Sequence, residues 1–208
     1  MHHASRILTI GFVLLFALPL AHAATFVTGL LGANENPAVV TAGTGSATVD
    51  LDTVAHTMRV RVNFSGLNGN TTASHIHCCT APPANVGVAT TTPSFVGFPL
   101  GVTSGTMDQT YDTTLAGTWN GAFVTANGGT PAGAEAALAA GLAAGQAYLN
   151  IHSSTSPGGE IRGFLSLLAA PAALIPTLSE WIVGLLALLL AAATWVALRK
   201  RARSAVRL

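Results

Sequence analysis

The sequence is poor in charged residues. Nine Lys or Arg and eight Asp or Glu make up 8% of 208 residues, against about 25% in an ordinary soluble domain. No basic stretch inside the chain is suited to follow a phosphate backbone, so we expect no nucleic-acid partner. Half of the residues are hydrophobic, and they concentrate at the two ends of the chain.

The sequence also lacks the usual signs of catalysis. No nucleophile–base pair, phosphate-binding glycine loop or pair of strand-end carboxylates stands out. The only two cysteines are neighbours, without the Cys-x-x-Cys spacing of thiol–disulfide enzymes. We therefore expect a protein that is not an enzyme. A metal-dependent redox activity is the alternative, and a thiol–disulfide device is a weaker third.

Residues 1–23 are typical of a secretory signal peptide. Arg6 precedes an apolar run over 7–21, and Ala21-His22-Ala23 is a small-x-small cleavage site. The other interpretation is an uncleaved anchor, but the run is broken by Pro19 and is short for a bilayer core of about 30 Å. We expect export and removal of this segment by signal peptidase.

A second apolar stretch, residues 181–198, is uncharged and predicts a transmembrane helix. At 1.5 Å per residue it would span about 27 Å. The tail 199–208 contains basic residues and no acidic one. Because basic residues stay on the cytoplasmic side, we expect the preceding domain to lie outside the cytoplasm.

Residues 24–168 are about one domain's worth of chain, rich in Gly, Thr, Ala and Val. Frequent turn signals and alternating hydrophobic residues favour an all-β sandwich or barrel. We expect a hairpin of strands 45–52 and 56–64, two strands at 106–112 and 118–126, and a closing pair at 147–153 and 159–168. One helix is expected over 131–145, and 169–180 forms a linker to the membrane.

The candidate site centres on His75 and His77, which project from one face of a strand because side chains at i and i+2 point the same way. The same rule places Asn150 beside His152 on the strand 147–153. If the two strands are neighbours, three imidazoles could hold zinc or copper. Glu160 is a candidate carboxylate ligand or acceptor for a ligating imidazole. The alternative is that these histidines only hydrogen-bond to backbone or water.

Cys78 and Cys79 directly follow this motif. Neighbouring Cα atoms are about 3.8 Å apart, less than the usual 4.4–6.8 Å of a disulfide. Three states stay open: a strained vicinal disulfide, two free thiols that add soft ligands to the histidines, or bonds to another chain.

Two segments, 73–90 and 147–165, resemble the CHRD domain, a module of many exported bacterial proteins. The resemblance rests on His75-Ile76-His77, Asn150-Ile151-His152 and Gly159-Glu160-Ile161-Arg162-Gly163. It implies an immunoglobulin-like or barrel-like β domain, in which Asn150, Glu160 and Arg162 support the motif. In that family a glycine usually follows His-x-His, and Cys78-Cys79 replaces it here.

The C-terminal region resembles the IPTL-CTERM sorting signal, which is similar in layout to signals handled by exosortases of Gram-negative bacteria. The resemblance implies that a membrane-embedded enzyme recognises and cuts this segment; the alternative is a bare linker. It also implies an inner-membrane protein with its domain in the periplasm, or one sorted onward to the outer membrane, surface or matrix. The motif residues are Ile175, Pro176, Thr177, Leu178, Ser179, Glu180 and Trp181.

These observations predict an exported, membrane-anchored or sorted protein of the bacterial envelope. Its expected role is non-enzymatic binding or adhesion, to an envelope or matrix ligand that the sequence does not identify. The alternative is a β domain that binds zinc or copper at the three histidines.

Overall fold

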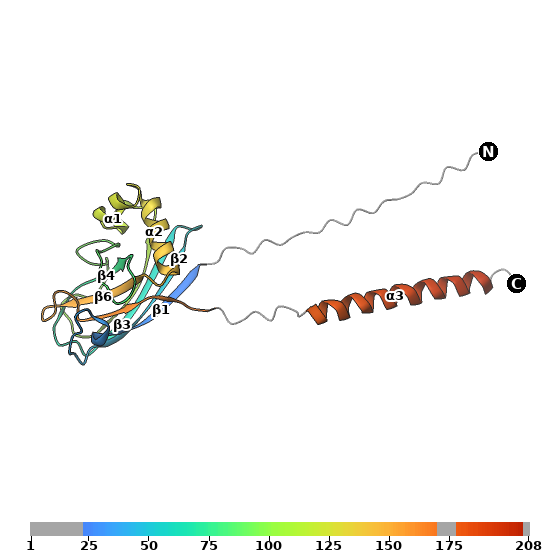
Figure 1. The fold of residues 1–208 in the computed structure, drawn as a ribbon, viewed down its shortest axis with the longest axis horizontal. Helices are drawn as coiled ribbons and strands as arrows, with labels where there is room; N and C mark the ends of the chain where they lie inside the picture. The colour runs from blue at the N-terminus through green and yellow to red at the C-terminus, as the bar shows by residue number, and fades with distance from the viewer. Residues whose placement is uncertain (1–22, 170–177, 206–208) are drawn as a thin grey trace. The chain divides into compact units, whose positions relative to one another are not determined.

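The computed structural model describes residues 23–169 and 178–205, and Figure 1 shows the fold. The chain divides into two units, Met1–Leu168 and Ala169–Leu208, which are treated one at a time. Nearly all of the predicted signal peptide (1–23) and most of the linker (169–180) lie outside the described residues. Ile175, Pro176 and Thr177 of the predicted sorting motif lie outside them too.

The first unit is mostly β, as predicted: an eight-stranded sheet curved like a half-barrel, with short helices. The strands follow the order β4-β6-β7-β1-β2-β3-β5, and β8 pairs with β1. In the described part of the chain, the strands of this sheet pair antiparallel. The strands are β1 (Ala24–Leu31), β2 (Thr44–Asp52), β3 (Thr57–Ser65), β4 (Thr71–Cys78), β5 (Gly105–Asp112), β6 (Ala147–Ser153), β7 (Ile161–Phe164) and β8 (Ser166–Leu167).

The predicted hairpin is confirmed as β2 and β3, with Leu51 opposite Met58. Their apolar side chains alternate into the core, because successive residues of a strand point to opposite faces. The predicted closing pair is confirmed as β6 and β7, although the second expected strand is interrupted at Leu165 and continues as β8.

The prediction of a strand over 118–126 is wrong. This segment forms the short 3-10 helix η2 (Ala116–Thr118) and then the helix α1 (Gly121–Ala126). Asn120 starts α1, because its side chain accepts a hydrogen bond from the amide of Ala122. There are thus two α-helices in the described part of the first unit, and the second, α2 (Pro131–Ala143), is the one predicted.

Both helices lie together over one side of the sheet (Figure 1). Leu138 and Leu142 of α2 are fully buried against the sheet residues Leu149 and Ile151. The helix begins with Thr130, whose hydroxyl accepts from the amide of Gly133, and with Pro131 at its first turn. A third short element, η1 (Gly32–Asn34), follows β1.

Strands β4 and β6 are covered on both faces, which explains why polar residues are buried there. Ile76 and Leu149 point into the hydrophobic core. The opposite face is covered by the segment 81–95, which runs beside β4: His77 bridges to Val88, and Phe95 donates its amide to Ser74. Alternation along the strands would leave His75, His77 and Asn150 in solvent, but in the structure these side chains are buried.

The second unit contains α3 (Leu178–Ala205), and Ile182–Arg201 is long and apolar enough to span a membrane. The helix is longer than the predicted 181–198: it begins inside the expected linker and continues through the first basic residues. There, the guanidinium of Arg199 lies 3.8 Å from the ring centre of Trp195.

Candidate metal centre

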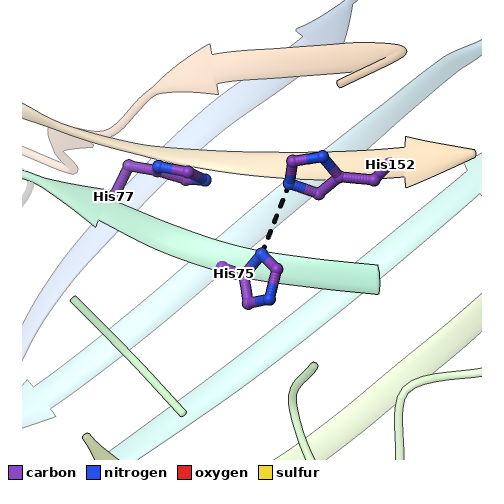
Figure 2. Close-up of side chains that lie close together, drawn as sticks. All are labelled: His75, His77 and His152. Atoms are coloured by element: carbon purple, nitrogen blue, oxygen red, sulfur yellow. Dashed lines mark hydrogen bonds between the residues drawn. The ribbon is translucent and has the colours of Figure 1, made fainter. Parts of the chain in front are cut away.

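The three predicted histidines come together on the covered face of β4 and β6 (Figure 2). In the strand register, His75 lies opposite Asn150 and His77 lies opposite Tyr148. His152, two residues beyond Asn150 on β6, lies opposite Ala73. Since all these side chains project from the same face, the imidazoles can lean toward one another.

One nitrogen of each imidazole faces the centre of the group. These atoms are His75 Nδ1, His77 Nε2 and His152 Nε2, and the three residues offer ligand atoms within 4.8 Å of one another. His75 Nδ1 and His152 Nε2 are 3.3 Å apart, the dashed contact in Figure 2. Two nitrogens bound to one tetrahedral zinc at 2.0–2.1 Å would be separated by about 3.3 Å. The ligand nitrogen of His77 lies within 4.8 Å of these two.

The second nitrogen of each imidazole is held by a backbone carbonyl. His75 Nε2 lies 2.6 Å from the oxygen of Pro93, His77 Nδ1 lies 2.8 Å from that of Val86, and His152 Nδ1 lies 2.9 Å from that of Pro157. A carbonyl only accepts, so each of these nitrogens carries the proton. The tautomers assigned by this network leave a lone pair on every inward nitrogen.

The pKa values of all three imidazoles are lowered, which favours the neutral form. Burial is the main cause: it lowers the pKa of His77 to about 4, against the raising effect of the Val86 hydrogen bond. Burial also lowers the pKa values of His75 and His152, which the bonds to Pro93 and Pro157 partly oppose. Neutral imidazole is the form that binds metal ions.

This arrangement fits a transition-metal site. A ligating histidine usually donates its other N–H to a carbonyl or carboxylate, which fixes the ring orientation and makes the ligand nitrogen more basic. Here three carbonyls do this, and His77 Nε2 is buried with no hydrogen-bond partner. Three imidazoles and no thiolate suit copper or zinc rather than calcium or magnesium.

Asn150 lies on the same face and shares a second unusual feature with Glu35. Neither Asn150 Oδ1 nor Glu35 Oε1 has a hydrogen-bond partner, although both are buried. A Cβ built on Gly159 would lie 2.6 Å from Asn150 Oδ1 and 2.8 Å from Glu35 Oε1. Both oxygens therefore lie close to Gly159, whose φ of 131° also favours glycine. The sequence pattern did not identify Glu35.

Arg162 is almost completely buried beside Glu35, with 1% of its surface exposed. Its guanidinium donates to the oxygen of Asn34, the oxygen of Pro83 and the side-chain oxygen of Asn85. The single N–H of Nε is used in the bond to Asn34, and Glu35 Oε2 lies 3.7 Å from Arg162 Nε. Burial raises the pKa of Glu35 to about 7, and the charge of Arg162 only partly opposes it.

Glu160 is not part of the histidine group. It holds loops of the β domain together through hydrogen bonds. Its carboxylate accepts hydrogen bonds from the hydroxyls of Thr41 and Ser153 and from the amides of Asn68 and Gly69. Burial acts to raise its pKa, and these hydrogen bonds outweigh that effect and hold the pKa below its usual value. The structure thus assigns Glu160 a supporting role in the fold.

Cys78 and Cys79 are joined by a disulfide, the first of the three states that the sequence left open. Cys78 points away from the imidazoles, because it follows His77 on the strand and belongs to the hydrophobic core. Both sulfur atoms pack against Gly141 of α2. The sulfurs and the imidazoles therefore occupy opposite faces of β4.

Replacing Gly141 by alanine is expected to lower the free energy of unfolding by about 1–3 kcal/mol through overpacking. The new Cβ would lie 2.6 Å from Cys79 Sγ and closer still to Cys78 Sγ. Helix propensity alone predicts the opposite sign, a gain of about 0.5–1 kcal/mol. Urea unfolding without reductant measures the difference. Gly121→Ala is the control, since nothing lies within 4 Å of its Cβ position, and a stabilised Gly141→Ala protein would contradict the packing argument.

Sequence reasoning missed the atoms that orient the site. Pro93, Val86 and Pro157 contribute backbone carbonyls. Every residue type has such a carbonyl, so the sequence does not identify these three acceptors. Alternation along β6 puts Tyr148 on the same face as His152, but no sequence pattern predicts its contact with His77: the two rings are stacked with centres 4.7 Å apart and planes 4° apart.

Comparisons with known proteins agree with the two resemblances noted in the sequence. Residues 26–165 match the family model of the CHRD domain, and residues 175–201 match that of the IPTL-CTERM motif. No curated protein and no solved structure matches significantly. The C-terminal signal and the apolar helix indicate an exported, sorted and membrane-associated protein. Because the first match covers most of the chain, this protein belongs to the CHRD domain family.

Proposed function

We propose that the exported domain binds one transition-metal ion, copper or zinc, through His75, His77 and His152, and that it does so without catalysing a reaction. The observation that supports this most strongly is the facing pair His75 Nδ1 and His152 Nε2, 3.3 Å apart. Both nitrogens carry lone pairs in the assigned tautomers, so they repel one another unless a cation lies between them. With the pKa values of both imidazoles lowered, a metal ion is a better candidate than a proton.

The chemistry of the donors narrows the class of ion. Imidazole nitrogens suit copper and zinc, whereas calcium and magnesium require several oxygen ligands. Within the described residues, the only group of at least three His, Cys, Asp or Glu arranged to hold a metal is this one. The disulfide removes both thiolates from consideration.

The setting of this domain is the second part of the proposal. The IPTL-CTERM match and α3 support insertion in the bacterial inner membrane with the domain in the periplasm. We further propose that an exosortase-like enzyme processes the segment 175–181 and passes the domain to the outer membrane, the surface or the matrix. An exported domain delivered in this way is also suited to binding or adhesion at the envelope, which is the second candidate function.

The test is metal content in the full chain, purified from membranes without a polyhistidine tag. The unaltered protein is expected to keep about one equivalent of copper or zinc after dialysis. The double variant His75→Ala/His77→Ala is expected to bind at least about a hundredfold more weakly, because each imidazole supplies a direct bond. Inductively coupled plasma mass spectrometry gives the content, and competition with a chelator gives the affinity.

His56→Ala is the matched control for this experiment. His56 is a histidine of the same domain, but its ring contacts Glu135 of α2 and lies outside the metal group. Its loss is expected to leave the metal content unchanged. If the unaltered protein holds less than about a tenth of an equivalent when zinc and copper are supplied, or if the double variant binds equally well, the proposed function is wrong.

A further inference from the structure

His77 differs from the other two histidines because an aromatic ring lies flat against it. The rings of His77 and Tyr148 are stacked, with centres 4.7 Å apart and planes 4° apart. The two residues are directly opposite one another on β4 and β6, so the strand register enforces this contact. Tyr148 is 2% exposed and has little freedom to move. Its ring therefore fixes the plane in which His77 Nε2 faces the centre.

The hydroxyl of Tyr148 contacts the same backbone group that fixes the tautomer of His77. It donates to the oxygen of Val86 at 3.3 Å and accepts from the amide of Val86 at 3.3 Å. The Val86 oxygen is also the acceptor for His77 Nδ1, at 2.8 Å. Tyr148 thus stacks on the face of the His77 ring and also bonds to the Val86 carbonyl that accepts from His77 Nδ1.

Arg162 supports Tyr148 and the same loop. Its guanidinium carbon lies 4.7 Å from the centre of the Tyr148 ring, a cation–π contact. The same guanidinium donates to Pro83 and Asn85, which lie three residues and one residue before Val86. The loop that orients His77 is thus held from two sides, by Tyr148 at Val86 and by Arg162 at Pro83 and Asn85.

We propose that Tyr148 is a positioning residue of the metal centre, which holds His77 in the ring plane and tautomer that metal binding requires. This inference rests on the proposed function. Tyr148 does not supply a ligand: it acts through His77, in the way that outer groups orient ligating histidines in metal sites. Without its ring, His77 rotates and exchanges between tautomers, and the other two nitrogens are left as an incomplete site.

Two variants separate the ring from the hydroxyl. Tyr148→Phe keeps the stacked ring and loses both contacts to Val86, whereas Tyr148→Leu loses the ring as well. We expect Cu²⁺ or Zn²⁺ to bind about 10–100-fold more weakly to Tyr148→Leu and about 3–10-fold more weakly to Tyr148→Phe. Phe164→Leu is the control: Phe164 contacts Tyr148, with ring centres 5.0 Å apart, and makes no ring contact with a histidine among the described residues. Its affinity is expected to stay unchanged.

A second measurement does not depend on metal. Long-range ¹⁵N–¹H NMR spectra of the metal-free full chain in detergent report the tautomer of each imidazole. The unaltered protein is expected to show a protonated Nδ1 on His77, and Tyr148→Leu a mixture of tautomers. Thermal unfolding identifies variants that are not folded, in which case Tyr148→Phe decides the matter.

The outcomes distinguish the two proposals. Suppose that His77 shows protonated Nδ1 in the unaltered protein and a mixture of tautomers in Tyr148→Leu, but that no metal binds. This result contradicts the proposed function, and with it the role of Tyr148 at a metal centre. A protein that binds metal, with equal affinity and equal His77 spectra in the folded Tyr148 variants, contradicts the positioning role alone.

Discussion

Replacing Glu160 by alanine is expected to lower the free energy of unfolding by about 3–5 kcal/mol, because two buried donors, Ser153 and Gly69, and two more exposed ones lose their acceptor. The residue is fully buried, and its carboxylate accepts from Thr41, Ser153 and the amides of Asn68 and Gly69. Each buried donor left unpaired costs roughly 1–3 kcal/mol. Urea unfolding of the full chain in detergent, followed by circular dichroism, measures the loss.

Asp108→Ala is the control for this comparison. Asp108 is bonded to Arg59 with good geometry, but both side chains are about half exposed, and such surface pairs contribute about 0–1 kcal/mol.

The pKa of Glu160 is lowered in the folded protein, so its stabilising effect is present above the unfolded pKa and is lost as the pH falls through the folded value. A Glu160→Ala protein as stable as Asp108→Ala at pH 7 would refute this account of Glu160.

Replacing Glu35 by glutamine is expected to make the domain more stable at pH 8 by about 3 kcal/mol, with little change at pH 4. Burial raises the folded pKa of Glu35 from 4.5 to about 7. A raised pKa means that stability is fully present below the unfolded value, near pH 4.5, and is lost as the pH rises through about 7. Glutamine stays neutral throughout, so the decline between these pH values should become flatter.

The local geometry explains why the protonated form is preferred. Glu35 Oε1 and Asn150 Oδ1 are both buried close to Gly159, and neither accepts a hydrogen bond from a donor. A proton on Glu35, or an amide hydrogen of glutamine, supplies one. Unfolding free energies at pH 4, 6 and 8 give the test. Asp112→Asn is the control, because the pKa of Asp112 is lowered by its bonds to Thr114. If Glu35→Gln shows the same decline as the unaltered protein, Glu35 does not hold this proton.

The strands could be predicted where hydrophobic residues alternate over a long stretch, as in β2 and β3. The stretch 118–126 has the aromatic and β-branched residues of a strand, yet it forms a helix. There Asn120 supplies a helix-starting side chain, and packing in the core orients Trp119 and Phe123. Tertiary contacts override local propensity in such short segments.

The sequence was sufficient to predict the three candidate ligands of the site, but not the groups that bury and orient them. Alternation was sufficient to place His75, His77 and His152 on one face, because strand geometry is regular. Burial of that face depends on the loop 81–95, whose path no periodicity describes. Glu35 could not be assigned from the sequence either, since it approaches Asn150 only after β1 and β7 have paired.

The three histidines have a consequence for when the site can be filled. His77 and His152 are far apart in the chain, and the carbonyls that fix their tautomers belong to loops between and after them. A chain that crosses the membrane unfolded has none of this geometry. On that route the proposed ion is acquired only after translocation and folding, so the metal supply of the compartment outside the cytoplasm, rather than the cytoplasmic pool, determines which ion is bound.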